Sequence, residues 1–150
     1  MLVFVAPSPS VDVTYVVDDF RPGGMHRPVS VHRNAGGRAL NAARSAATMG
    51  ADALAVTELG GHSGDFIAER LPQEGVGLRA VRGSQETRTC ISIASVAGGD
   101  LTEIYEYATP VSAGEWDGLR TAVHTLLPLR PGWVAASGSL PAGLDPGALT

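Results

Sequence analysis

Short apolar runs alternate along the chain with stretches in which apolar residues recur every three or four positions. Runs of four to six mainly apolar residues are typical of strands buried on both faces of a parallel sheet. They are found at 2–6, 53–57, 78–81 and 133–136. Helical spacing predicts helices at 39–49, at 63–71, from 112 to about 127, and from near Pro146. Strands that alternate with helices predict an α/β layer with a mostly parallel sheet flanked by helices.

Local signals set the predicted helix ends. Ser112 and Glu115 have the spacing of a capping box, so a helix begins there. Ser63 is predicted to be the N-cap of the second helix, which Pro72 then stops. Gly50 closes the first helix at its C-terminal side.

A second group of segments alternates apolar and polar residues, which is typical of strands with one solvated face. These segments do not fit the parallel layer, so they predict a separate small β-sheet, or lid. They lie near 12–17, 29–33, 87–96 and 103–107. We therefore predict one unit over residues 1–150, an α/β fold that carries a β-sheet lid.

Composition narrows the function. The chain has 150 residues, 44% hydrophobic, with a formal net charge of −4, which argues against binding to nucleic acid or to a membrane surface. Cys90 is the one cysteine, so no intrachain disulfide forms. The apolar start, residues 1–6, is too short for a membrane span and lacks a basic leader. We expect a soluble cytoplasmic protein.

The sequence has neither the spacing of metal-binding residues nor a nucleotide-binding loop of the Walker type. The four histidines have no metal-ligand spacing, and a Walker-type loop needs a lysine, which this chain lacks. All basic residues are arginines, so any cationic contact must come from a guanidinium. Trp116 and Trp133 are predicted to pack in the core or against a helix.

The pair Gly36-Gly37 is the most informative feature. Adjacent glycines let the main chain lie flat against a ligand, because no β-carbon stands in the way. A predicted helix follows at once, and its N-terminal amides carry the positive end of the helix dipole. Asn41 falls in the first turn of that helix, where its amide can reach the same ligand.

Three further loops carry polar groups, each with an ordinary alternative. Asp12 could accept hydrogen bonds from sugar hydroxyls, or be a turn aspartate. Arg88, between two threonines, could bind a phosphate through its two-pronged guanidinium, or be a solvated arginine. Ser139 follows a predicted buried strand and could form a pocket floor, or belong to a simple turn.

In this order and spacing, the loops resemble the N-terminal half of a ribokinase-like (PfkB-family) carbohydrate kinase. The similarity is strongest to the 1-phosphofructokinase and tagatose-6-phosphate kinase branch, and it covers essentially the whole chain. The residues that carry it are Pro9-Ser10-Val11-Asp12, Gly36-Gly37 with Asn41, Gly50-Ala51, Leu59-Gly60-Gly61, Glu86-Thr87-Arg88-Thr89, Thr102-Glu103-Ile104 and Ser137-Gly138-Ser139-Leu140-Pro141.

The resemblance implies roles for individual residues. Asp12 and Asn41 would bind sugar hydroxyls, and Gly36 and Gly37 would pack against the sugar ring. Arg88 would hold the phosphate already on the sugar, and Ser139 would line the pocket. Arg38 stands where the branch usually has a lysine and keeps its charge. Arg27, on the lid, would reach the substrate phosphate of a neighbouring subunit, since the lid forms a homodimer interface in relatives.

The resemblance also implies a reaction. It is the ATP-dependent phosphorylation of a phosphorylated ketohexose, with fructose 1-phosphate first and tagatose 6-phosphate or fructose 6-phosphate next. The Gly-Ala-Gly-Asp segment that supplies the family's anion hole and catalytic base does not occur in these residues. We therefore expect the base beyond Thr150, ATP and Mg²⁺ in the full-length enzyme only, and no activity from this chain alone.

Two alternatives stay open. The chain could be a non-catalytic sugar-phosphate binding protein or a fragment of a decayed kinase. It could also belong to a kinase whose substrate is a nucleoside or an unphosphorylated sugar. Replacement of Arg88 distinguishes this second alternative, because it should weaken the binding of a substrate only if that substrate carries a phosphate.

Overall fold

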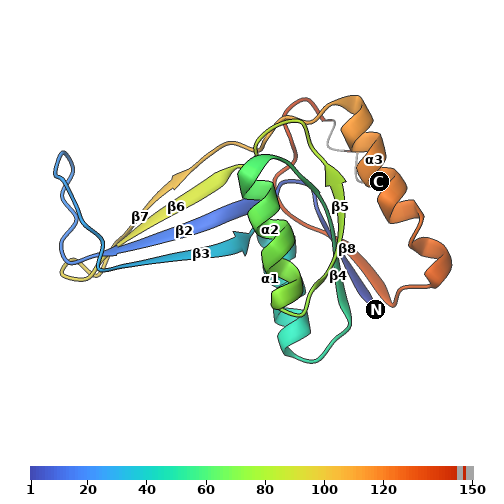
Figure 1. Ribbon diagram of the computed structural model, residues 1–150, viewed down its shortest axis with the longest axis horizontal. Coiled ribbons are helices and arrows are strands. Elements are labelled where there is room, and N and C mark those ends of the chain that lie inside the picture. The colour runs from blue at the N-terminus through green and yellow to red at the C-terminus, as the bar shows by residue number, and fades with distance from the viewer. Residues whose placement is uncertain (145–146, 148–150) are drawn as a thin grey trace.

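The computed structural model describes residues 1–144 and 147, so the helix expected from near Pro146 lies outside the described residues. The chain folds into strands and helices (Figure 1). In chain order they are β1 (Leu2–Ala6), β2 (Ser10–Val17), β3 (Ser30–Gly36), α1 (Arg38–Thr48), β4 (Ala53–Leu59), α2 (Gly61–Gln73), β5 (Gly77–Arg82), β6 (Thr89–Ser95), β7 (Leu101–Tyr105), α3 (Ala113–His124), a 3₁₀ turn at Leu127–Leu129, and β8 (Trp133–Ala136).

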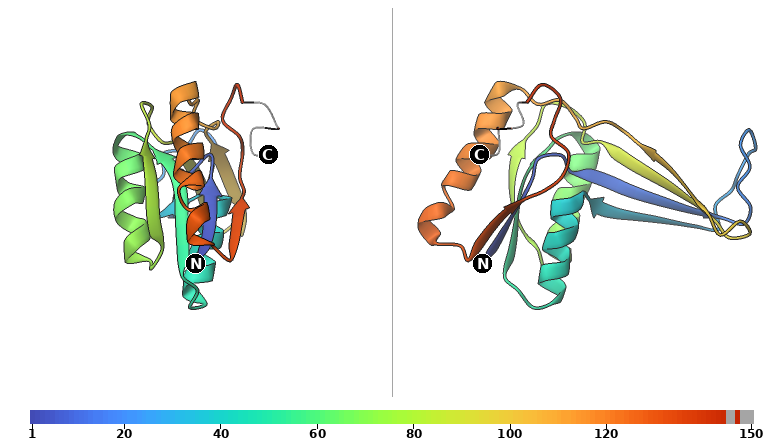
Figure 2. Two further views of the ribbon diagram at one scale, coloured as in Figure 1. Left: turned by 90° about the vertical axis from the view of Figure 1, so that its right-hand side faces the viewer. Right: turned by 180° about the vertical axis from the view of Figure 1, so that it is seen from behind.

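The first sheet has the strand order β5-β4-β1-β8, and its neighbouring strands are all parallel. Helices α1 and α2 pack on one face and α3 on the other (Figures 1 and 2). Side chains along a strand alternate between the faces, which divides the core in two. Val3 and Val5 of β1 pack with α3, whereas Ala6 packs with α1 and α2. The apolar run at 2–6 is therefore buried on both faces, as predicted.

The second sheet has the order β3-β2-β6-β7 and extends from the first like an arm (Figure 1). Its two outer pairs, β2–β3 and β6–β7, are antiparallel, and the central pair β2–β6 is parallel. These are the four alternating segments of the sequence, with ends shifted by a few residues. The predicted fold class, a parallel sheet flanked by helices with a small β lid, is confirmed.

Strand register gives the arm two different faces. Directly paired residues point to the same side, so Asp12, Cys90 and Tyr105 form one row across β2, β6 and β7. Val13, Ile91 and Ile104 form the next row, on the opposite side. One face of the arm is therefore polar at its root, and the other is largely apolar.

Ser63 is not the N-cap predicted for the second helix. Helix α2 begins at Gly61, with Gly60 as its N-cap, and Ser63 lies inside the first turn. A carboxylate from a distant loop caps this end, because the amides of His62 and Ser63 donate to Glu86 at 3.2 and 2.6 Å. The hydrogen bond from Ser63 is the main cause of a lowered pKa at Glu86. A local signal cannot show a cap supplied from 23 residues away.

The strand at 133–136 is present, but it is not buried. Strand β8 lies at the edge of the described sheet, paired with β1, and its four residues are exposed. Trp133 is 77% exposed, so the prediction that it packs in the core or against a helix is wrong, whereas Trp116, on α3, is buried against the first sheet. Helix α3 begins with the predicted Ser112–Glu115 capping box but ends at His124, three residues before the predicted end at Leu127.

Strand β6 begins at Thr89, two residues later than predicted, because Thr87 is tied to the end of β4. The amide of Gly60 donates to Thr87 Oγ1 at 3.0 Å, and the amide of Thr87 donates to the Gly60 carbonyl at 2.9 Å. A β-carbon at Gly60 would overlap the Gln85 carbonyl. This contact fixes the start of β6 against the first sheet. No helix among the described residues has the length and apolar character needed to cross a membrane.

Candidate sugar-binding site

A cavity of about 290 Å³ lies where the polar root of the second sheet meets the strand ends of the first. It gathers residues from all four loops singled out in the sequence, including Asp12, Asn41, Arg88 and Ser139. The residues that line it are Ser8, Ser10, Asp12, Gly37, Arg38, Asn41, Arg88, Cys90, Tyr105, Gly138 and Ser139. Segments far apart in the sequence therefore form one site.

Asp12 lies on β2, and its side chain is held in a fixed position. Ser10 Oγ donates to Asp12 Oδ1 at 2.6 Å. Gly36, which ends β3, lies directly behind the carboxylate, and a β-carbon there would overlap it. Gly36 is therefore a steric requirement of Asp12, whereas Gly37 is the glycine that lines the cavity. Gly37 has φ of 103°, a region that favours glycine.

The N-terminus of α1 faces the same cavity. Its N-cap is Gly37, which provides no side-chain hydrogen bond, and the first helical bond runs from Asn41 to Gly37. The preceding amides have no acceptor within the helix, so this end attracts anions. Asn41 Oδ1 accepts from Arg44 at 2.9 Å, which leaves the amide nitrogen of Asn41 as the donor toward a ligand.

Arg88 is anchored by two main-chain oxygens. Its guanidinium donates to the Glu106 carbonyl at 3.0 Å and to the Ser8 carbonyl at 3.4 Å. Arg88 Nε is buried and has no hydrogen-bond partner among the described residues. A guanidinium that is held from behind and still has unused donors is suited to binding an anion at its open side.

Sequence reasoning did not assign a binding role to Ser8, Ser10, Cys90 or Tyr105, all of which line the cavity. Burial raises the pKa of the Cys90 thiol. The hydrogen bond from Tyr105 to Glu103 is the main cause of a raised pKa at Tyr105. One signal points to Ser8: its hydroxyl lies two residues after the carboxyl end of β1.

Arg27 does not line this cavity. It is exposed in the loop between β2 and β3, at the far end of the arm (Figure 1). Val17, the last residue of β2, lies five residues after Asp12, which corresponds to roughly 17 Å along the strand. The prediction that Arg27 reaches a neighbouring subunit stays a prediction.

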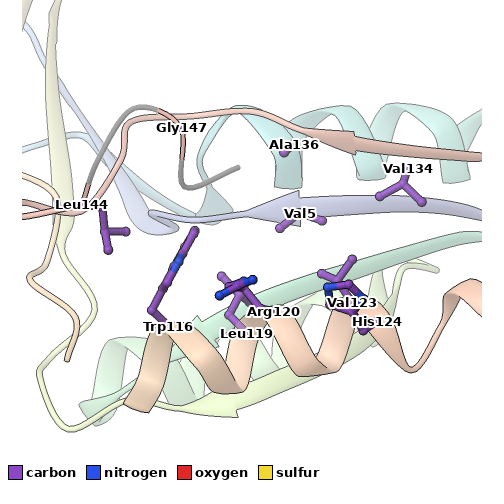
Figure 3. A pocket seen from close by; sticks show the side chains of 10 residues that line it. All are labelled: Val5, Trp116, Leu119, Arg120, Val123, His124, Val134, Ala136, Leu144 and Gly147. Atoms are coloured by element: carbon purple, nitrogen blue, oxygen red, sulfur yellow. The ribbon is translucent and has the colours of Figure 1, made fainter. Parts of the chain in front are cut away.

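A larger cavity, of about 660 Å³, separates α3 from β1 and β8. Figure 3 shows Trp116, Leu119 and Val123 of α3 pointing toward the two strands. Its lining is largely apolar, with Arg120 and His124 as polar exceptions, and none of the predicted site residues lies there. Among the described residues, no group of His, Cys, Asp or Glu side chains could hold a metal ion.

Glu58, at the end of β4, is a buried carboxyl close to the site. It is 8% exposed and, with Ser8 and Thr87, lines a separate cavity of about 20 Å³. Burial first, and then the charge of Glu115, raises the pKa of Glu58 to about 7. Glu115 itself keeps a pKa of about 2, because it accepts hydrogen bonds from Ser112 and Ser84.

Comparison with known families explains this arrangement of loops. Residues 3–149 match the pfkB family of carbohydrate kinases, and the chain belongs to this family. All four loops of the cavity lie within the matched residues.

Solved structures of related proteins have the same fold. Phosphofructokinase-2 from Escherichia coli, solved in complex with fructose-6-phosphate, is 25% identical, with a TM-score of 0.84 over 99% of this chain and 48% of its own. A possible 1-phosphofructokinase from Thermotoga maritima is 21% identical, with a TM-score of 0.87 over 97% of this chain and 47% of its own. The chain therefore spans about half the length of these proteins.

The substitution Gly36→Ala tests the contact behind Asp12. The new β-carbon must push the Asp12 carboxylate out of its position and break its hydrogen bond with Ser10. Loss of a hydrogen bond to a charged group costs about 1.5–3 kcal/mol, so Tm should fall by roughly 3 °C or more. A crystal structure of the variant should show Asp12 displaced.

Gly132→Ala is the matched control, because a β-carbon at Gly132 meets its neighbours only at ordinary contact distances of 3.7 and 3.9 Å. It should leave both Tm and Asp12 unchanged. An unmoved Asp12 in the Gly36→Ala structure would show that the close approach does not fix this carboxylate.

The raised pKa of Glu58 predicts a pH-dependent stability. The pKa is about 7 in the folded protein against an ordinary value of 4.5, so the folded state retains the proton longer than the unfolded state. The contribution of Glu58 to stability is therefore fully present below pH 4.5 and is lost as the pH rises through 7, by about 1.4 kcal/mol for each unit of pKa difference. Glu58→Gln should raise Tm at pH 8 and leave it nearly unchanged at pH 4.5.

Thermal unfolding from pH 4.5 to pH 8.5 measures this difference. Glu69→Gln, on the exposed surface of α2, is the control and should follow the wild-type curve at every pH. A Tm difference between wild type and Glu58→Gln that does not grow with pH would contradict the assignment.

Proposed function

We propose that this chain forms the sugar-binding half of an ATP-dependent kinase that phosphorylates a phosphorylated ketohexose. Fructose 1-phosphate is the leading substrate, followed by tagatose 6-phosphate and fructose 6-phosphate. The observation that carries the proposal is a single cavity combining an acid, an amide, a serine and an anchored guanidinium: Asp12, Asn41, Ser139 and Arg88.

In this proposal each residue meets one part of the sugar phosphate. The Asp12 carboxylate accepts hydrogen bonds from sugar hydroxyls, and the free amide nitrogen of Asn41 donates to another. Gly37 lets the ring approach the main chain closely, because it has no side chain. Arg88 holds the phosphate already present on the sugar, and Ser139 contacts the ligand from the loop after β8.

The charge distribution of the cavity favours a phosphorylated ligand over a neutral sugar. Two guanidinium groups, Arg38 and Arg88, line it together with the N-terminus of α1, whereas Asp12 is the one carboxylate among the lining residues. Phosphate oxygens suit this excess of positive charge. Escherichia coli phosphofructokinase-2, which shares the fold, was solved with fructose-6-phosphate bound.

The proposal assigns no catalytic base to this chain. ATP, Mg²⁺ and the base belong to a nucleotide-binding half outside the 150 residues, and the isolated chain transfers no phosphoryl group. Phosphoryl transfer depends on positioned charges around the transferring group, and this half contributes only the positioning of the acceptor sugar.

The proposal also includes a homodimer formed through the second sheet. Its apolar face carries Val31 and Ile104, which are 37% and 57% exposed. A second copy would cover this face, since exposed apolar surface and open strand edges favour association. Arg27, at the far end of the same arm, would then lie near the partner's cavity.

Arg88→Ala tests the proposed phosphate contact. Removing a charge-assisted hydrogen bond costs about 1.5–3 kcal/mol, so the Kd for fructose 1-phosphate should rise by roughly 10- to 100-fold. The Kd for unphosphorylated fructose should stay unchanged, because fructose has no group for Arg88 to hold. Titration calorimetry of the purified chain measures both.

Arg79→Ala is the control, since Arg79 is an exposed arginine of β5 outside the cavity. It should leave both affinities at the wild-type value. Equal losses for fructose and fructose 1-phosphate in Arg88→Ala would contradict a phosphate contact and favour a neutral substrate. Absence of sugar-phosphate binding by the wild type would overturn the proposed function itself.

A further inference from the structure

Two buried polar atoms at one end of the cavity have no partner among the described residues: Ser8 Oγ and Arg88 Nε. Ser8 is only 6% exposed. A buried hydroxyl or N–H group without a partner is costly, so nearly all such groups in proteins are satisfied by protein, water or ligand. Two of them in one cavity indicate that a ligand completes their hydrogen bonds.

The two atoms belong to neighbouring residues. Arg88 donates to the Ser8 carbonyl at 3.4 Å, which places the Ser8 main chain beside the guanidinium. Gly37 closes the same end, because a β-carbon on it would lie 3.4 Å from the Ser8 carbonyl oxygen. The Ser8 main chain therefore lies between an anchored guanidinium and the N-terminus of α1, both of which attract anions.

We infer that Ser8 is a specificity-determining residue of this site, whose hydroxyl donates a hydrogen bond to the phosphoryl group held by Arg88. This inference rests on the proposed function and deepens it. Phosphoryl oxygens accept several hydrogen bonds at once, so one such group can satisfy both Ser8 Oγ and Arg88 Nε. A neutral sugar hydroxyl cannot replace it beside a guanidinium at equal strength.

Ser8 also lines the 20 Å³ cavity next to Glu58, which is large enough for one water molecule. A water there could satisfy the Ser8 hydroxyl. It would leave Arg88 Nε without a partner, because Arg88 lines the 290 Å³ cavity but not the 20 Å³ cavity. A ligand in the larger cavity accounts for both atoms. The experiment below separates these occupants.

Ser8→Ala gives opposite effects on affinity and on stability if the inference is correct. Loss of a hydrogen bond to a charged group should raise the Kd for fructose 1-phosphate about tenfold, with the Kd for fructose unchanged. Removal of an unsatisfied buried hydroxyl should raise the Tm of the unliganded chain by about 2–4 °C. Calorimetry and thermal unfolding measure the two effects on the same protein.

Two other serines are the controls. Ser10→Ala removes a buried hydroxyl that does have a partner, Asp12, and should lower Tm. Ser30→Ala changes the far end of β3 and should change neither measurement. The combination of weaker sugar-phosphate binding and higher stability is therefore specific to a buried hydroxyl whose hydrogen-bond partner is the bound ligand.

An unchanged Kd for fructose 1-phosphate in Ser8→Ala, with wild-type binding intact, would overturn the inference and leave the proposed function standing. A lowered Tm with unchanged Kd would also overturn it and assign Ser8 to the water next to Glu58. If the wild type binds no sugar phosphate, the proposed function fails first, and the inference fails with it.

Discussion

The close approach of two glycine turns to the root of the second sheet is the constraint on which the site depends. Gly36 lies against the Asp12 carboxylate, and Gly60 lies against the Gln85 carbonyl. A side chain at either position would overlap these atoms. The first contact fixes the side chain of Asp12, on β2, against the end of β3. The second, with the hydrogen bonds between Gly60 and Thr87, fixes the segment that leads to Arg88.

The register of the second sheet, whose root is fixed by these contacts, determines which of its side chains face the cavity. Its strand register places Asp12, Cys90 and Tyr105 in one row that faces the cavity. The opposite face packs on α2 near the root, where Val11, Val13 and Ala35 are buried, and it carries the exposed side chains Val31 and Ile104. One sheet thus provides both a polar binding face and an apolar face for association, because strand residues alternate between sides.

Features with a local cause were predictable from the sequence. The apolar run of β1, the Ser112–Glu115 capping box and the glycine turn before α1 are each determined by neighbouring residues, and each is present. The convergence of Asp12, Asn41, Arg88 and Ser139 was predictable only because their loops resemble those of a known family. Their meeting in one cavity depends on long-range strand pairing, which periodicity does not reveal.

The errors also have a physical cause, since each involves a partner distant in the sequence. The cap of α2 comes from Glu86, and the start of β6 is set by Gly60, so neither could be read locally. The apolar run at 133–136 resembles a buried strand, but β8 pairs on one side only among the described residues. Ser8 was overlooked because a serine between prolines is typical of a turn; its burial shows only in three dimensions.

The most direct test of a shared sugar-phosphate cavity is a ¹H–¹⁵N NMR titration of the chain with fructose 1-phosphate. We expect saturable shifts confined to residues 8–12, 36–41, 88–90 and 137–139, which come from four separate parts of the sequence but line one cavity. Shifts grouped instead around the cavity beneath α3, or scattered without saturation, would contradict the account.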